Sequence, residues 1–170
     1  MKRICRIIEG LASLLSAGHP CDMLDLDDFL PYRLNVLAKR VSRELARRYE
    51  AQFGISIPEW RVMAILGREQ PLSSNDIVER SAMDKAKVSR AVTSLVEAGL
   101  IARDTHPSDQ RLLRLSFTVK GKALYDRIAP LALEWQQRWL NCLDEAELAQ
   151  FKALSAKLEG QLEQLARDVL

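Results

Sequence analysis

The chain has 170 residues, which suits a single domain or one compact core with added helices. Hydrophobic residues make up 48% of the sequence and charged residues 28%, a composition that excludes a disordered or fibrous protein. The formal net charge of +2 points to no class of partner, so only the distribution of charge along the chain is informative. Seven glycines and six prolines are few, which favours a mainly helical fold.

The cysteines and residues 1–22 indicate the cellular compartment of the protein. Cys5, Cys21 and Cys142 form neither a disulfide framework nor a CxxC metal motif, which predicts a reducing, cytoplasmic environment. No apolar run reaches the ~20 residues that a membrane span needs, so we expect no membrane association. In residues 1–22 the isoleucines and leucines recur at helical spacing, which favours an amphipathic helix over a secretion signal. The alternative is that Met23 is the natural start.

Helix signals fill most of the first hundred residues. Hydrophobic residues recur at every third or fourth position, and glycine, proline, serine and aspartate mark the ends of successive helices. The signals predict a first helix that Asp27 or Asp28 caps and that reaches to about Phe53, followed by helices over residues 58–67, 73–82 and 84–100. Gly67 is the expected stop of the second helix, Ser73 with Asp76 forms a capping box for the third, and Asp84 caps the fourth.

The pattern then changes to strands. Residues 101–105 and 111–117 alternate in polarity around the turn-forming segment 106–110, so we expect a two-stranded hairpin. Two long helices follow, the first capped by Thr118, and the last carries an apolar stripe suited to helix-on-helix packing.

The order of helix, short helix, three-residue turn, second helix and hairpin is that of a winged helix-turn-helix, a DNA-binding fold. At the start of the 84–100 helix, lysine and arginine can reach guanine edges or phosphates, and small residues allow close approach to the groove. At the hairpin tip, Asp109 can orient the guanidinium of Arg111 for the minor groove, although the two also fit a simple surface pair. The candidate DNA-binding residues are Ser73, Lys85, Ala86, Lys87, Ser89, Arg90, Asp109 and Arg111.

Three motifs in this region resemble the MarR (multiple antibiotic resistance regulator) family. They are D-K-x-x-V-S-R at residues 84–90, D-x-R at residues 109–111 and F-T-V-K-G at residues 117–121, where the family usually has leucine for the phenylalanine. The resemblance covers residues 24 to 170. It implies a homodimer with interleaved terminal helices, two recognition helices on palindromic double-stranded DNA, and a ligand that usually weakens DNA binding.

Fold class and domains follow from these observations. We expect a mainly α protein with a small β-hairpin wing, in which a winged helix-turn-helix domain is joined to N- and C-terminal dimerisation helices. The predicted boundaries are an N-terminal extension at 1–22, dimerisation helices at 23–53 and 119–170, and a DNA-binding domain at 54–118 with its wing at 101–117. The apolar stripes exceed what a small winged domain can cover, which independently favours a dimer.

The switch that controls the regulator has two candidate forms. A small aromatic acid or aryl-coenzyme A effector would need an aromatic wall and a cation, although Trp60 and Met63 also fit an ordinary core. The candidate ligand-binding residues are Tyr32, Arg33, Trp60, Arg61 and Met63. Some members of the family sense peroxides through a cysteine, but Pro31 stands at the position that this resemblance assigns to it, so redox sensing is the alternative.

No enzyme motif accompanies these features. His19 and His106 are the two histidines, and the sequence contains no HExxH, GxSxG, P-loop or dinucleotide fingerprint. We therefore expect a transcriptional regulator, most simply a repressor, with no cofactor and no metal. The rival is a winged-helix protein-interaction module without affinity for DNA.

Overall fold

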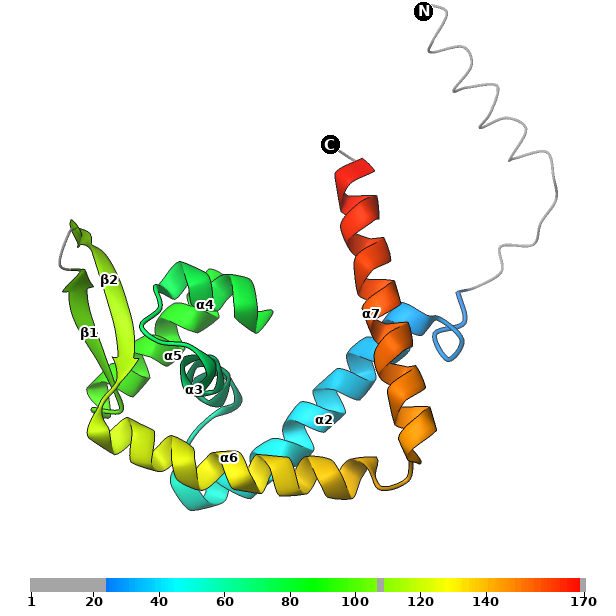
Figure 1. The fold of residues 1–170 in the computed structure, drawn as a ribbon, viewed down its shortest axis with the longest axis horizontal. Helices are drawn as coiled ribbons and strands as arrows, with labels where there is room; N and C mark the ends of the chain where they lie inside the picture. Colours follow the sequence, from blue (N-terminus) through cyan, green and yellow to red (C-terminus); the bar gives the residue numbers. More distant parts are fainter. Residues whose placement is uncertain (1–23, 107–108, 169–170) are drawn as a thin grey trace, which may run out of the picture. The chain divides into compact units, whose positions relative to one another are not determined.

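The computed structural model describes residues 24–106 and 109–168 (Figure 1). Its elements in chain order are α2 (Leu30–Phe53), α3 (Ile57–Arg68), α4 (Ser74–Ser81), α5 (Lys85–Glu97), β1 (Ile101–His106), β2 (Asp109–Phe117), α6 (Val119–Leu140) and α7 (Glu145–Asp168). The protein is therefore mainly helical with a two-stranded antiparallel hairpin, as the sequence predicts. Within the described ranges, no helix combines the length and the apolar character that a membrane crossing requires. The expected extension at 1–22 lies outside the described residues.

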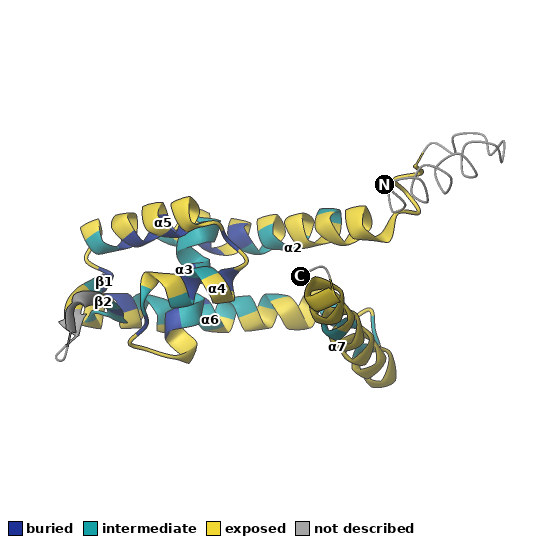
Figure 2. Ribbon diagram, turned by 90° about the horizontal axis from the view of Figure 1, so that it is seen from above, coloured by how far each residue is buried: buried dark blue, intermediate teal, exposed yellow. Residues whose placement is uncertain are grey.

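The chain divides into two compact units, residues 1–41 and 42–170, and the boundary falls inside α2. The second unit contains the whole hydrophobic core, which runs from Ala46 to Ile128. Its innermost side chains, such as Val62 on α3 and Leu95 on α5, have no exposed surface. Figure 2 shows this pattern, with dark-blue buried positions along α3 and α5 and none along α7.

Local side-chain hydrogen bonds start α4 and α6 where the sequence predicts. The Ser73 hydroxyl accepts from the Asp76 backbone N–H at 3.2 Å, while the Asp76 carboxylate accepts from the Ser73 N–H at 2.7 Å. This reciprocal pair satisfies two backbone donors that the first turn of α4 leaves open. Thr118 likewise accepts from the Gly121 N–H at the start of α6, so these caps are confirmed.

Gly67 does not end α3, and this prediction is wrong. The helix continues through Arg68, and Gly67 lies in its last turn. A Cβ atom at Gly67 would lie 2.2 Å from the Cζ of Tyr125, which belongs to α6. The glycine is therefore needed because an aromatic ring from a distant part of the sequence packs directly on the helix backbone.

The wing has one connection that the sequence does not reveal. Leu72, just before α4, pairs with Leu115 of β2 through two backbone hydrogen bonds of 3.1 and 2.7 Å. Leu115 itself is buried, with 1% of its surface exposed. The Phe117 N–H of the same strand donates to the Gln70 side chain at 2.8 Å. The hairpin is thus fastened to the segment that leads into α4.

Candidate nucleic-acid interface

Helices α4 and α5 form the predicted helix-turn-helix. Helix α4 ends at Ser81, and Ala82 adopts a left-handed conformation with φ of 51°, which turns the chain. Met83 anchors the turn with only 7% of its surface exposed. The Asp84 side chain then accepts from the Lys87 backbone N–H at 2.8 Å and starts α5. Residues 82–84 therefore form the expected three-residue turn.

Helix α5 has one apolar and one polar face. Its inner face is formed by the buried residues Val88, Ala91, Val92 and Leu95. The other face is open to solvent over the first two turns and carries the predicted contact residues Lys85, Ala86, Lys87, Ser89 and Arg90. Because burial holds the inner face, the position of these exposed side chains is fixed by the core beneath them.

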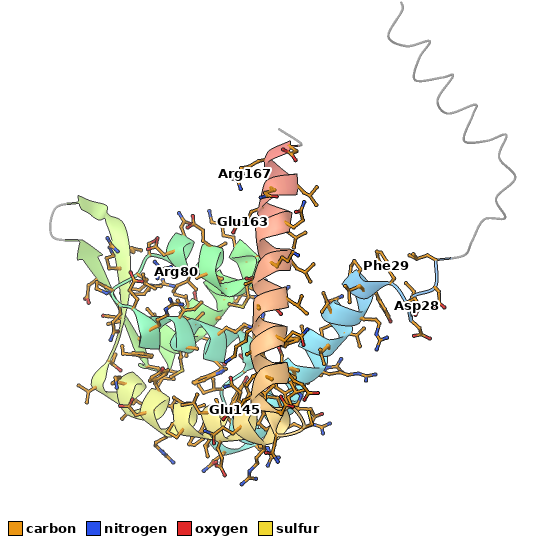
Figure 3. All side chains as sticks on the ribbon, turned by 45° about the vertical axis from the view of Figure 1, so that its right-hand side comes forward. Asp28, Phe29, Arg80, Glu145, Glu163 and Arg167 are labelled. Atoms are coloured by element: carbon orange, nitrogen blue, oxygen red, sulfur yellow. The ribbon has the colours of Figure 1, made fainter. Side chains whose placement is uncertain are left out.

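The basic side chains of α4 and α5 form different ion pairs within the protein. The Lys87 ammonium lies 2.9 Å from an Asp84 oxygen. Hydrogen bonds from the Lys87 side chain and backbone N–H hold the pKa of Asp84 below its usual range. Arg80 lies on α4 (Figure 3). It donates to Glu69 at 2.6 Å and so joins α4 to the residue that follows α3. To contact a phosphate, Lys87 must therefore give up its ion pair with Asp84.

The wing places Asp109 and Arg111 on β2, after a register shift between Thr105 and His106. The strands extend to His106 on one side and begin at Asp109 on the other, so the turn is shorter than the predicted 106–110. The side chains of residues 105–112 lie outside the described ones, and the pairing of Asp109 with Arg111 stays a prediction.

One basic residue beside α5 was missed by the sequence reasoning. Arg103 on β1 is exposed and donates to the Thr93 hydroxyl on the open face of α5 at 3.3 Å. Its charge could have indicated that Arg103 is exposed, but the alternation of the strand places it on the same face as the buried Ile101, and neither signal shows that it lies against α5. This contact places an exposed guanidinium beside the helix that also exposes Lys85, Lys87 and Arg90.

The predicted ligand-binding residues lie in different environments. Tyr32 and Arg33 are exposed on the first turns of α2, in the first unit. In the second unit, Trp60 is half-buried between Tyr49 and Tyr125, with ring centroids 5.6 and 5.9 Å away.

The other two candidate ligand residues belong to the second unit as well. Arg61 donates to the Ser42 hydroxyl at 3.2 Å. Met63 has no exposed surface and belongs to the core. Burial is the largest cause that raises the pKa of Tyr49, the neighbour of Trp60, to about 12.

The cysteines and possible metal ligands can be located only in the described part of the chain. Cys142 is an exposed free thiol at the end of α6, while Cys5 and Cys21 lie outside the described residues. Over residues 24–106 and 109–168, no three His, Cys, Asp or Glu side chains are grouped so that they could hold a metal ion.

The helix-turn-helix and its attached hairpin define a winged helix-turn-helix protein. Comparisons identify the family. The profile of the MarR family matches residues 55–113. A solved MarR/EmrR family transcriptional regulator from Acinetobacter sp. ADP1 superimposes with a TM-score of 0.76 at 30% identity, covering 83% of this chain and 99% of that chain. This chain belongs to the MarR family.

Curated relatives agree with this assignment. The transcriptional regulator BilQ of Clostridium symbiosum is 29% identical over 105 residues, which are 62% of this chain and 73% of that protein. The transcriptional repressor MdtR of Bacillus subtilis is 27% identical over 125 residues, or 74% of this chain and 80% of that protein. The chain is accordingly a DNA-binding transcriptional regulator and not an enzyme.

Proposed function

We propose that this chain is a homodimeric, cytoplasmic repressor that binds a palindromic operator and is released by a small aromatic acid or an aryl-coenzyme A ligand. In this proposal α5 enters the major groove and the wing reaches the minor groove. Its DNA-binding residues are Ser73, Lys85, Ala86, Lys87, Ser89, Arg90, Asp109 and Arg111.

One observation carries the DNA-binding part of the proposal. The first two turns of α5 expose two lysines, an arginine and two small residues directly above a fully packed inner face. Long donors on a rigid support can read base edges, and small neighbours let the backbone approach the groove. Ser73, by contrast, uses its hydroxyl oxygen to cap α4, and the hydroxyl hydrogen remains for a phosphate oxygen.

The DNA-binding residues can be tested by fluorescence anisotropy on promoter DNA flanking the gene. We expect Arg111→Ala to weaken binding by about 1–3 kcal/mol, and Arg90→Ala to weaken it similarly and also relax the sequence preference. Arg167→Ala on α7, outside the helix-turn-helix and wing, is the matched control (Figure 3). A binding isotherm that neither Arg90→Ala nor Arg111→Ala changes would instead identify a protein-interaction module.

The exposed apolar stripe of α7 supports the homodimer. Phe151, Leu154, Leu158, Leu162 and Leu165 expose between 50% and 66% of their surface. A soluble chain rarely leaves such a stripe open, and a two-fold interface would bury it twice. We propose that residues 23–53 and 119–170 supply this interface, although Ala46, Tyr49 and Ile128 from these segments also complete the core of the winged part.

The effector is the least constrained part of the proposal. An aromatic carboxylate would lie against Trp60 and pair with Arg61, with buried Met63 only as part of the wall behind them. Tyr32 and Arg33 on α2 stay predicted ligand-binding residues. For a coenzyme A thioester, the exposed Arg40 and Arg43 would contact phosphates. If Arg40→Ala and Arg43→Ala leave the affinity for an aryl thioester unchanged, these two arginines do not contact its phosphates, which counts against the coenzyme A proposal.

A further inference from the structure

We propose that Glu59 is a positioning residue for DNA recognition, because its hydrogen bond to Ser94 fixes the orientation of α5. The proposal rests on the proposed role of α5 as the recognition helix. Glu59 lies in the first turn of α3, and Ser94 lies 35 residues further along the chain, on the exposed face of α5.

The two carboxylate oxygens of Glu59 have different tasks. One oxygen accepts from the backbone N–H of Ser56 at 2.7 Å and from the Ser56 hydroxyl at 2.6 Å, which closes the first turn of α3. The other oxygen accepts from the Ser94 hydroxyl at 2.5 Å. Helix capping needs only the first oxygen, so the second is available to join two helices.

The hydrogen bond between Glu59 and Ser94 constrains the orientation of α5, which apolar packing alone does not. The inner faces of α3 and α5 meet through side chains such as Val62 and Val92, which set the distance between the helices. Apolar contacts have little directionality, whereas a hydrogen bond depends strongly on its angle. Among the residues that the structure describes, Glu59–Ser94 is the one side-chain hydrogen bond between α3 and α5. It therefore restricts how far α5 can rotate or tilt on its apolar support.

The same pair borders the proposed DNA contacts. Glu59 and Ser94 line a shallow hollow of about 370 Å³ together with Lys87, Arg90 and Ala91. A small shift of α5 at Ser94 would move the Arg90 guanidinium, which lies one helical turn earlier. Base-edge contacts require placement to within about 0.5 Å, whereas phosphate contacts tolerate displacement. Losing the bond should therefore reduce specificity more than total affinity.

The charge state of Glu59 fits this role. Burial raises the pKa of its carboxyl group, but the hydrogen bonds from Ser56 and Ser94 outweigh burial and hold the pKa below its usual range. At neutral pH the group is a carboxylate, which accepts stronger hydrogen bonds than a neutral oxygen does.

The test compares binding to a preferred site, selected from a random-sequence DNA pool, with binding to a scrambled duplex of the same length. Ser94→Ala removes the bond between the helices, and Ser94→Thr keeps a hydroxyl. Ser56→Ala removes the hydroxyl that binds the other oxygen of Glu59, within the first turn of α3, and leaves the bond to Ser94 in place. We expect Ser94→Ala to lower the affinity for the selected site about tenfold and the affinity for scrambled DNA by less than about twofold. Ser94→Thr should restore the ratio of the two affinities, and Ser56→Ala should leave it unchanged.

Melting temperatures measured in parallel separate positioning from simple stability. If Ser94→Ala lowers the melting temperature and both affinities together, as Ser56→Ala would by weakening a cap, the bond is merely structural and the proposal fails. An unchanged affinity ratio in Ser94→Ala overturns it as well. If the wild-type protein selects no preferred site at all, it is the proposed function that fails.

Discussion

The winged part of the molecule and helix α7 use similar local signals but reach different degrees of burial. Both begin their helices with reciprocal caps, Ser73 with Asp76 in α4, and Asp144 with Glu147 in α7. Yet α3, α4 and α5 all contribute buried side chains, whereas α7 has no buried residue. The difference shows that a cap and an apolar stripe specify a helix, while its stability comes from the surface against which the stripe packs.

If a second copy of the chain covers the stripe of α7, a charge on that stripe should have the largest effect. Leu158 exposes half of its side chain in the single chain. Leu158→Asp should weaken the dimer by about 3–6 kcal/mol, or roughly a hundredfold or more, because each interface loses two buried leucines. Analytical ultracentrifugation over a range of concentrations measures this dissociation constant.

Ala156→Asp is the matched control, since it introduces the same carboxylate on the opposite face of α7, at an exposed position. It should leave the dimer intact. Equal dissociation in both variants would show that the added charge, and not the apolar stripe, is responsible. A dimer that survives Leu158→Asp would place the interface elsewhere.

Gly121, at the start of α6, and Gly160, on α7, differ in how closely they are packed. A Cβ at Gly121 would lie 1.7 Å from the backbone oxygen of Leu100, whereas a Cβ at Gly160 on α7 meets nothing within 4 Å. Gly121→Ala should lower the free energy of unfolding by about 3 kcal/mol, because backbone cannot move aside easily. Gly160→Ala should raise it by about 0.5–1 kcal/mol through helix propensity. Urea denaturation of both variants tests the contrast, and a destabilising Gly160→Ala would show that a second chain covers that side of α7.

The smallest expected effect is the pH dependence of the α4 cap. The hydrogen bond from the Ser73 N–H lowers the pKa of Asp76, a half-buried residue. The folded state therefore favours the carboxylate, and this contribution is present above the unfolded pKa and lost as the pH falls through the folded one. Unfolding measured from pH 6 to below about 4 should show a shallower loss of stability for Asp76→Asn than for wild type. Identical slopes would assign the acid sensitivity to other carboxylates.

The sequence predicted the elements of the winged part because their signals are local. Asp84 lies within one turn of the Lys87 N–H that it caps, and Gly99 has the positive φ of 66° expected of a helix stop. Gly67 is also a glycine, but it does not stop a helix. It is needed because a Cβ there would collide with the ring of Tyr125, which lies far along the chain. No spacing rule within α3 distinguishes these two uses of glycine.

In the candidate DNA-binding site, some residues could likewise be predicted from the sequence and others could not. The period of α5 is enough to predict that Lys85, Lys87 and Arg90 are exposed, because their neighbours Val88 and Val92 must be buried. Arg103 against Thr93 could not be predicted, because strand and helix are oriented by packing and not by sequence spacing.

By itself, the sequence determined which segments are helices or strands, where most of them begin, and which family the chain resembles, since these depend on residues within a turn or two. Only the tertiary structure decided that Leu72 joins the wing, that Tyr125 lies on Gly67 and that Glu59 bonds to Ser94. Those contacts join residues distant in the chain, and their geometry exists only after the apolar faces of α3, α5 and α6 have packed together.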